Sequence, residues 1–304
     1  MTRTQELFKG LEEKGTLLFD EPLWVHTTFK IGGNAEVFFT PRSEDALIGA
    51  VKTAKRAGVP YYIFGNGSNL LVDDAGLTGI VIRIGEGLDE IRNLGNGRIF
   101  CGAGCRLVQL CNYALNNSMA GLEFAYGIPG SVGGAIFMNA GAYGGEIGDV
   151  IGKVRCYDPE KDAVEEIDVS DLVFKYRDTD FMKSGKIILA GYFKLDSGDE
   201  KDISARMTEL IEKRRSRQPL DKASAGSTFK RPEGYYAGVL IENAGLKGFT
   251  VGGAQVSPKH AGFVVNNGDA SCKDVLAVID HVREKVFEEN KVHLETEVIY
   301  LKNE

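Results

Sequence analysis

Residues 127–149, GIPGSVGGAIFMNAGAYGGEIGD, are the most informative part of the sequence. From residue 127 to residue 152 the chain has nine of its 38 glycines. Glycine lets a backbone approach a ligand closely and adopt positive φ. Isoleucine, valine, phenylalanine and methionine are interspersed, so a flexible linker is a poor explanation. The pattern indicates a loop that closes around a flat or phosphate-bearing ligand, and a purely structural turn is the weaker alternative.

A second glycine-rich segment, GNGSNLLV, occupies residues 65–72 directly after an expected buried strand. Its backbone N–H groups and short polar side chains suit phosphate oxygens, but a polar hairpin turn explains it equally well. The chain contains neither G-x-x-x-x-G-K-[ST] nor G-x-G-x-x-G. These absences exclude a P-loop and leave a Rossmann site unsupported.

Alternating helix and strand signals predict an α+β protein. Ser43 and Ser271 are suitable helix N-caps, and Gly58 is a suitable helix end. The alternation of apolar and polar residues from 291 to 301 predicts a strand. The expected helices are 43–57, 106–116, 202–217 and 272–289, and the expected strands are 59–64, 79–84, 98–101, 151–157, 186–195 and 291–301.

Composition sets further limits. A net charge of −7 over 304 residues disfavours nucleic-acid binding, and no apolar run is long enough to enter a membrane. The amino terminus lacks a secretory signal, so we expect a cytoplasmic protein. Four dispersed histidines and an odd number of cysteines predict no metal site and no disulfide framework. The cysteines are expected to be small buried side chains: Cys101, Cys105, Cys111, Cys156 and Cys272.

Positive charge is concentrated in one region of the sequence. Residues 206–231 carry eight basic and three acidic side chains. Such a run is typical of a solvated helix face, but here it leads into Ala225–Arg231 and also fits an anion such as a diphosphate. The segment Lys175–Asp178 is compatible with either a structural ion pair or a catalytic arginine. Glu295 and Glu297 fit exposed strand carboxylates as well as a functional role.

Taken together, these motifs resemble the bacterial UDP-N-acetylenolpyruvoylglucosamine reductases. The matches follow the family's order over nearly the whole chain, and their number makes the resemblance specific. No long insertion with an extra tyrosine-bearing substrate loop is found, so the sequence resembles the shorter subclass. Besides the two glycine-rich segments, the matching stretches are HTTFKIGGNA (26–35), KYRDTDF (175–181), RRSRQP (214–219), AGSTFKRP (225–232), IENAGLKG (241–248), VSPKHAGFVVN (256–266) and LETEV (294–298).

The resemblance implies an FAD-binding domain of the vanillyl-alcohol-oxidase (PCMH) type and a smaller α+β substrate-binding domain. We expect the FAD-binding region at residues 1–200, in subdomains of about 1–67 and 68–200. The substrate-binding domain is expected at 201–290, and a C-terminal strand, 291–304, is expected to return to the FAD region. Oligomeric state is not readable from the sequence.

The implied activity is an NADPH-dependent, FAD-mediated reduction of a nucleotide-sugar enolpyruvyl ether to UDP-N-acetylmuramate. This reaction belongs to cytoplasmic peptidoglycan precursor synthesis, and through it to cell-wall biogenesis, cell shape and cell division. Arg177 would stabilise the developing anion with Glu297, and Ser227 would donate the proton. Because no histidine occurs from 58 to 150, we expect FAD to be bound non-covalently.

The resemblance also assigns ligand contacts. The substrate contacts are expected at Tyr176, Arg217, Gln218 and Lys230. The flavin contacts are expected at Gly65, Asn66, Gly67, Ser68, Asn69, Gly127, Ile128, Pro129, Gly130, Ser131, Gly133, Gly134, Asn139, Ala140 and Gly141. Two rival hypotheses remain: another FAD oxidase or dehydrogenase on the same fold, and a non-enzymatic nucleotide-sugar binding protein, which would be colourless.

Overall fold

A computed structural model describes residues 1–303, which contain both helices and strands. The chain divides into two compact units. The first unit comprises residues 1–19, 37–66 and 79–214; the second comprises residues 20–36, 67–78 and the chain from 215 onward. Each unit encloses its own cluster of buried apolar side chains. Each can therefore be stabilised by its own apolar core.

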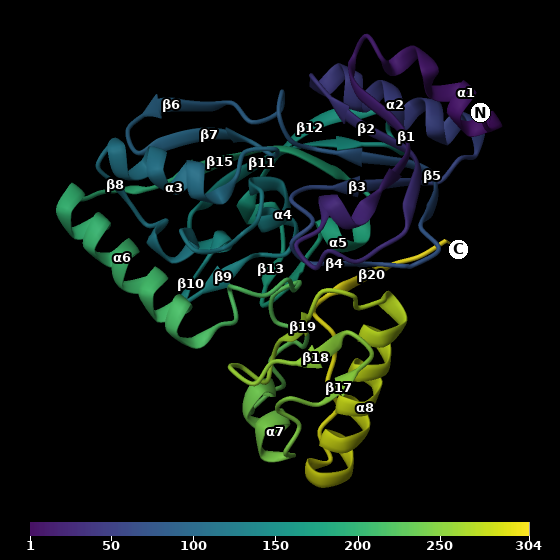
Figure 1. The fold of residues 1–304 in the computed structure, drawn as a ribbon. Helices are drawn as coiled ribbons and strands as arrows, with labels where there is room; N and C mark the ends of the chain where they lie inside the picture. The colour runs from purple at the N-terminus through teal and green to yellow at the C-terminus, as the bar shows by residue number, and fades with distance from the viewer. Residues whose placement is uncertain (304) are drawn as a thin grey trace. The chain divides into compact units, whose positions relative to one another are not determined.

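The first unit is built on a five-stranded antiparallel sheet with the order β12-β11-β15-β7-β6 (Figure 1). Helix α4 packs on β15 and β7, and α3 packs on α4. The strands are β6 (Ile91–Gly95), β7 (Arg98–Gly102), β11 (Ile151–Asp158), β12 (Ala163–Asp168) and β15 (Ile187–Lys194), and the helices are α3 (Leu107–Asn116) and α4 (Val132–Phe137).

A second sheet has the order β1-β2-β5-β3, with β3 and β5 parallel. The boundary between the units runs through β1, β2 and β5, and also through α6. These elements are β1 (Gly15–Pro22), β2 (Asn34–Pro41), β3 (Tyr61–Phe64), β5 (Leu77–Arg83) and α6 (Glu200–Arg217). The remaining α-helices and strands of the first unit are α1 (Arg3–Phe8), α2 (Glu44–Ala57), α5 (Phe181–Ser184), β8 (Met119–Ala120), β9 (Gly141–Ala142), β10 (Gly145–Glu146), β13 (Phe174–Lys175), β14 (Asp178–Thr179) and β16 (Asp196–Ser197).

The second unit contains a three-stranded antiparallel sheet, β17-β18-β19, on which helix α8 packs. Helix α7 also contacts α8. The C-terminal strand β20 pairs in parallel with β4. The elements are β4 (Leu70–Val72), α7 (Ala237–Asn243), β17 (Thr250–Val251), β18 (Ala254–Val256), β19 (Val264–Asn266), α8 (Cys272–Asn290) and β20 (Ile299–Leu301).

The two helices with clear capping signals lie where the sequence predicts them. The Ser43 hydroxyl accepts a hydrogen bond from Ala46 N, and Gly58 ends α2 in the left-handed conformation at φ +64°. The Ser271 side chain accepts from Asp274 N at the start of α8. Caps satisfy backbone groups that the helix itself leaves unpaired, so they fix helix ends locally.

Two expectations of secondary structure are wrong. The strand expected at 291–301 is assigned only over Ile299–Leu301; before it, the chain pairs with the segment at 228–230 through the single bridge Phe229–Thr296. The glycine-rich stretch is not all loop, because Ser131 caps the helix Val132–Phe137 within it. At Gly133 a Cβ would lie 2.8 Å from Ala103 Cβ, so the glycine allows this helix to approach its neighbour closely.

None of the helices within residues 1–303 combines the length and the hydropathy that a bilayer-spanning segment needs. Within the same residues, no three His, Cys, Asp or Glu side chains form a group suited to a metal ion. The prediction that the cysteines are small buried side chains is confirmed, since all five are buried.

Candidate functional site

The two glycine-rich segments meet within the first unit. The Asn66 side-chain amide donates a hydrogen bond to Pro129 O at 2.7 Å. A Cβ added at Gly65 would lie 2.3 Å from Ser131 Oγ, so a larger residue would displace one segment from the other. Ser131 is 3% exposed, and its hydroxyl accepts from Gly134 N at 3.3 Å. This close packing brings Gly65 and Asn66 to the loop that the sequence proposes for the flavin.

The end of the glycine-rich segment at residues 65–72 lies in the second unit and connects there to the C-terminal segment. The Asn69 side-chain amide donates to Glu297 O at 2.9 Å, and Ile299 N donates to Asn69 O at 2.9 Å. Gly67 has φ +62°, and a Cβ there would lie 2.1 Å from His26 O. A flavin-contact candidate, Asn69, therefore lies beside the backbone of a catalytic candidate, Glu297.

Arg177 occupies the turn of a two-residue hairpin between β13 and β14. Its φ is +52°, a left-handed conformation that costs a non-glycine residue about 1–2 kcal/mol. Its guanidinium donates to Asn139 O at 3.2 Å and to Gly141 O at 3.0 Å. The ring of Tyr176 lies below it, with 5.2 Å between the guanidinium carbon and the ring centre. Strained backbone of this kind persists only where its surroundings hold it, as they do here.

The side chain of Asn139 stabilises the hairpin that carries Arg177. Asn139 is fully buried at φ +45°. Its amide donates to Lys175 O at 3.1 Å, and its side-chain oxygen accepts from Gly148 N at 2.8 Å. These bonds tie the hairpin that carries Arg177 to the glycine-rich stretch. The side chain of Asn139 is thus committed to protein partners, and its backbone carbonyl and N–H also bond to the protein, at Arg177 and Ile136 O.

Ser227 and Glu297 lie on neighbouring segments of the second unit. Glu297 N donates to Thr228 O at 2.8 Å, and Lys230 N donates to Glu295 O at 2.8 Å. Thr228 is itself fixed, because its N–H donates to Gly262 O at 2.8 Å and its hydroxyl accepts from Val264 N at 3.0 Å. Both candidate side chains are half-buried. The main chain therefore pairs Glu297 with Thr228, the residue that follows Ser227.

The substrate-contact candidates differ in their surroundings. Tyr176 and Arg217 are exposed, Lys230 is half-buried, and the Lys230 ammonium is 3.5 Å from a carboxylate oxygen of Glu295. Gln218 has a buried side-chain oxygen with no hydrogen-bond partner among residues 1–303. A buried, unpaired amide oxygen suits a ligand donor better than a structural role.

Arg214 is a further residue of interest, to which the sequence assigns no role beyond its place in the basic run and in the stretch RRSRQP (214–219). On α6 the buried side chains are Ile203, Met207 and Leu210. Arg214 continues this stripe one turn later, and its Nε is buried without a hydrogen-bond partner in the described chain. The helical period of the apolar residues is the signal that separates it from the exposed Arg215.

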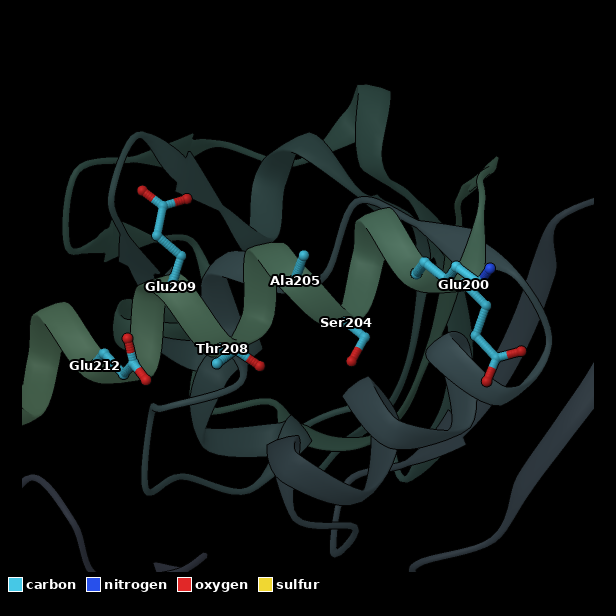
Figure 2. Close-up of a pocket in the computed structure, with 7 residues that line it drawn as sticks. Glu200, Ser204, Ala205, Thr208, Glu209 and Glu212 are labelled. Carbon is cyan, nitrogen blue, oxygen red and sulfur yellow. The ribbon is translucent and has the colours of Figure 1, made fainter.

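The outer face of α6 carries a shallow hollow of about 740 Å³. Figure 2 shows its side chains standing on the side of α6 that faces the viewer, among them Ser204, Ala205 and Thr208. It is lined by residues of α6 alone, three of them glutamates, and contains none of the residues discussed above. A site for an anionic nucleotide sugar would not be lined in this way.

Two known protein families match different parts of the chain. Residues 35–165 match a family described as an FAD binding domain, and residues 218–301 match the C-terminal domain of UDP-N-acetylenolpyruvoylglucosamine reductase. A UDP-N-acetylenolpyruvoylglucosamine reductase of Clostridium perfringens is 44% identical over 301 residues, covering 98% of each chain. The chain belongs to the UDP-N-acetylenolpyruvoylglucosamine reductase family. It is thus an oxidoreductase and a flavoprotein with an FAD-binding domain.

Other members of the reductase family agree in length and fold. The reductase of Clostridium beijerinckii is 46% identical over 294 residues, covering 97% of this chain and 96% of its own. The crystal structure of the reductase from Thermus caldophilus superposes with a TM-score of 0.81 at 35% identity, covering 95% of this chain and 99% of its own. The predicted α+β fold, with an FAD-binding domain and a separate C-terminal domain, is confirmed, as is the shorter form of the reductase.

Proposed function

We propose that this reductase uses NADPH and non-covalently bound FAD to convert UDP-N-acetylglucosamine enolpyruvate to UDP-N-acetylmuramate. In a cell this reaction would supply peptidoglycan precursors from the cytoplasm. When bound, FAD would supply hydride transfer from the nicotinamide to the substrate. The packing of Gly65 and Asn66 on the Pro129–Ser131 loop supports a flavin site, because it brings together two glycine-rich segments of the kind whose backbone N–H groups bind phosphate oxygens.

The chain's own residues would manage the negative charge that follows hydride addition. Hydride reaches the terminal carbon of the enolpyruvyl double bond, and the electron pair moves toward the neighbouring carboxylate. A guanidinium fixed before the reaction stabilises such charge without reorganising. The two carbonyl bonds to Asn139 and Gly141 hold Arg177 in that way, which supports its assignment as the anion-stabilising residue.

Ser227 would then transfer its hydroxyl proton to the α-carbon, and Glu297 would act as a protonated hydrogen-bond partner of the same anion. Serine is a weak acid, so it can donate only to a strongly basic enolate-like carbon held at hydrogen-bond distance. Solvent would return the proton to the serine alkoxide. The observation that carries this assignment is the bond from Glu297 N to Thr228 O, which brings the two candidates onto adjacent segments.

The test separates the two half-reactions under anaerobic conditions. NADPH is expected to bleach the flavin absorbance, and UDP-N-acetylglucosamine enolpyruvate is expected to restore it in one turnover. UDP-N-acetylglucosamine, which lacks the double bond, serves as the control. A protein whose reduced flavin is reoxidised by dioxygen but not by the enolpyruvyl compound would be another flavin oxidase or dehydrogenase. Release of the yellow chromophore on denaturation would establish non-covalent binding.

A further inference from the structure

Arg214 is the buried charge that the proposed mechanism does not use. It follows Ile203, Met207 and Leu210 on the inward stripe of α6, and its own exposure is intermediate. Its Nε is buried and has no hydrogen-bond partner among residues 1–303. Leaving a buried donor of a charged group unpaired costs at least about 1–3 kcal/mol. A purely structural arginine would not be expected to leave this donor unused.

The neighbours of Arg214 add a second observation. A Cβ at Gly127 would lie 3.0 Å from Arg214 Cδ and 2.9 Å from Ile211 Cδ1, so glycine is what lets the arginine stem lie against the start of the glycine-rich loop. Burial lowers the pKa of the guanidinium, and the positive charge of Arg177 lowers it further. The Tyr143 hydroxyl is the acidic group that acts in the opposite direction. Two arginines thus repel each other beside the expected ligand loop.

We propose that Arg214 and Arg177 together bind one delocalised, planar oxyanion at the redox site. The planar fork of a guanidinium matches such an anion through paired N–H···O bonds, and an anion between the two would remove their repulsion and satisfy the unused donor. The inference rests on the proposed function, which offers two sources of this chemistry. They are the carboxylate of the enolpyruvyl group and the anionic pyrimidine edge of the reduced flavin ring.

The test compares Arg214→Met with Arg215→Met, since the neighbouring Arg215 is exposed on the same helix. Arg214→Lys keeps the charge and keeps the experiment informative if the methionine variant fails to fold. The first measurement is the flavin midpoint potential without substrate. If the anion is the reduced ring, Arg214→Met lowers the preference for reduced flavin at least tenfold, which is about 30 mV for a two-electron couple.

The second measurement is binding of UDP-N-acetylglucosamine enolpyruvate to the oxidised enzyme, followed by perturbation of the flavin spectrum. If the anion is the carboxylate, Arg214→Met weakens this binding at least tenfold, the lysine variant recovers part of the loss, and the potential does not move. UDP-N-acetylglucosamine, which has no carboxylate, should bind the wild type and the variant equally.

Two results would overturn the inference. One is an Arg214→Met protein with wild-type potential and wild-type substrate affinity. The other is loss of FAD from Arg214→Met with full retention in Arg214→Lys and Arg215→Met, which would assign the residue to the cofactor's phosphates. If the wild-type protein bound neither flavin nor the enolpyruvyl compound, the proposed function itself would be contradicted. Neither measurement requires turnover, so the two failures are distinguishable.

Discussion

Arg177 and Ser227 are held in place by different means. The guanidinium of Arg177 is fixed by side-chain hydrogen bonds on a strained turn, and the buried amide of Asn139 ties that turn to the glycine-rich stretch. Ser227 is positioned by main-chain bonds of its neighbour Thr228. Substitutions near Arg177 should therefore alter stability and chemistry together, whereas substitution of Ser227 should alter chemistry alone.

The largest effect is expected for Ser227→Ala. Turnover should fall by more than about 10³-fold, because the substitution removes the proton donor, beyond the 10²–10³-fold loss typical of one electrostatic donor. The free energy of unfolding should stay within about 0.5 kcal/mol of wild type, since the hydroxyl is not what holds the segment. Steady-state assays and urea denaturation measure these, with Ser224→Ala as control. Equal slowing of flavin reduction by NADPH would contradict the assigned role.

Arg177→Lys is expected to have the next largest effect. An ammonium cannot reproduce a fork that donates to Asn139 O and Gly141 O while facing an anion. Turnover should fall about 10²-fold, and reduction of the flavin by NADPH should be little changed. Lys183→Met, which removes the exposed ion pair with Asp178, is the matched control and should leave turnover unchanged. Full activity of the lysine variant would show that the fork is not needed.

Asn139→Ala tests the support beneath Arg177. It removes two hydrogen bonds and places alanine at φ +45°, so unfolding should become easier by about 3 kcal/mol. Turnover should fall as well, because the hairpin loses its tie to the glycine-rich stretch. Asn139→Gly removes the same bonds without the backbone strain and should recover about 1 kcal/mol. Identical stability of the two variants in urea titrations would argue against the strain.

The sequence predicts those secondary-structure elements that depend on interactions between residues close together in the chain. The ends of α2 and α8 depend on caps within a few residues, so the sequence predicts them closely. The alternation at 291–301 predicts a strand over the whole stretch, but the strand forms only at Ile299–Leu301, because pairing in a sheet depends on distant partners. The glycines of α4 favour a loop prediction because glycine has a low helix propensity, although Ser131 is a usable N-cap signal.

The candidate site divides in the same way. Motif resemblance singled out Arg177, Ser227 and Glu297, and the bond between the Thr228 and Glu297 backbones agrees with that choice. The support from Asn139 could not be predicted, because its partners lie outside its local sequence: Lys175 is remote along the chain, and Gly148 belongs to a separate short 3-10 helix. Arg214 was open to prediction from the apolar period of its helix, had that period been extended past Leu210.

The smallest effect is expected in the second unit, at Tyr300→Phe. The Tyr300 hydroxyl donates to Asp73 and, with Ala75 N, lowers the pKa of that carboxyl. The unfolded chain then binds a proton more readily than the folded one, so this stabilisation is present at neutral pH and disappears as the pH falls below about 4. Tyr300→Phe should flatten the acid limb of a stability–pH curve, and Tyr235→Phe should not. An unchanged acid limb would contradict the assignment.

The most direct test of the account is a crystal structure of the enzyme with FAD and UDP-N-acetylglucosamine enolpyruvate, in which the reacting double bond is located. Ser227 Oγ is expected to lie within hydrogen-bond distance of the α-carbon that receives the proton. Arg177 and Glu297 are expected to contact the enolpyruvyl carboxylate. A complex in which any of these three side chains faces away from the bound enolpyruvyl group would contradict it.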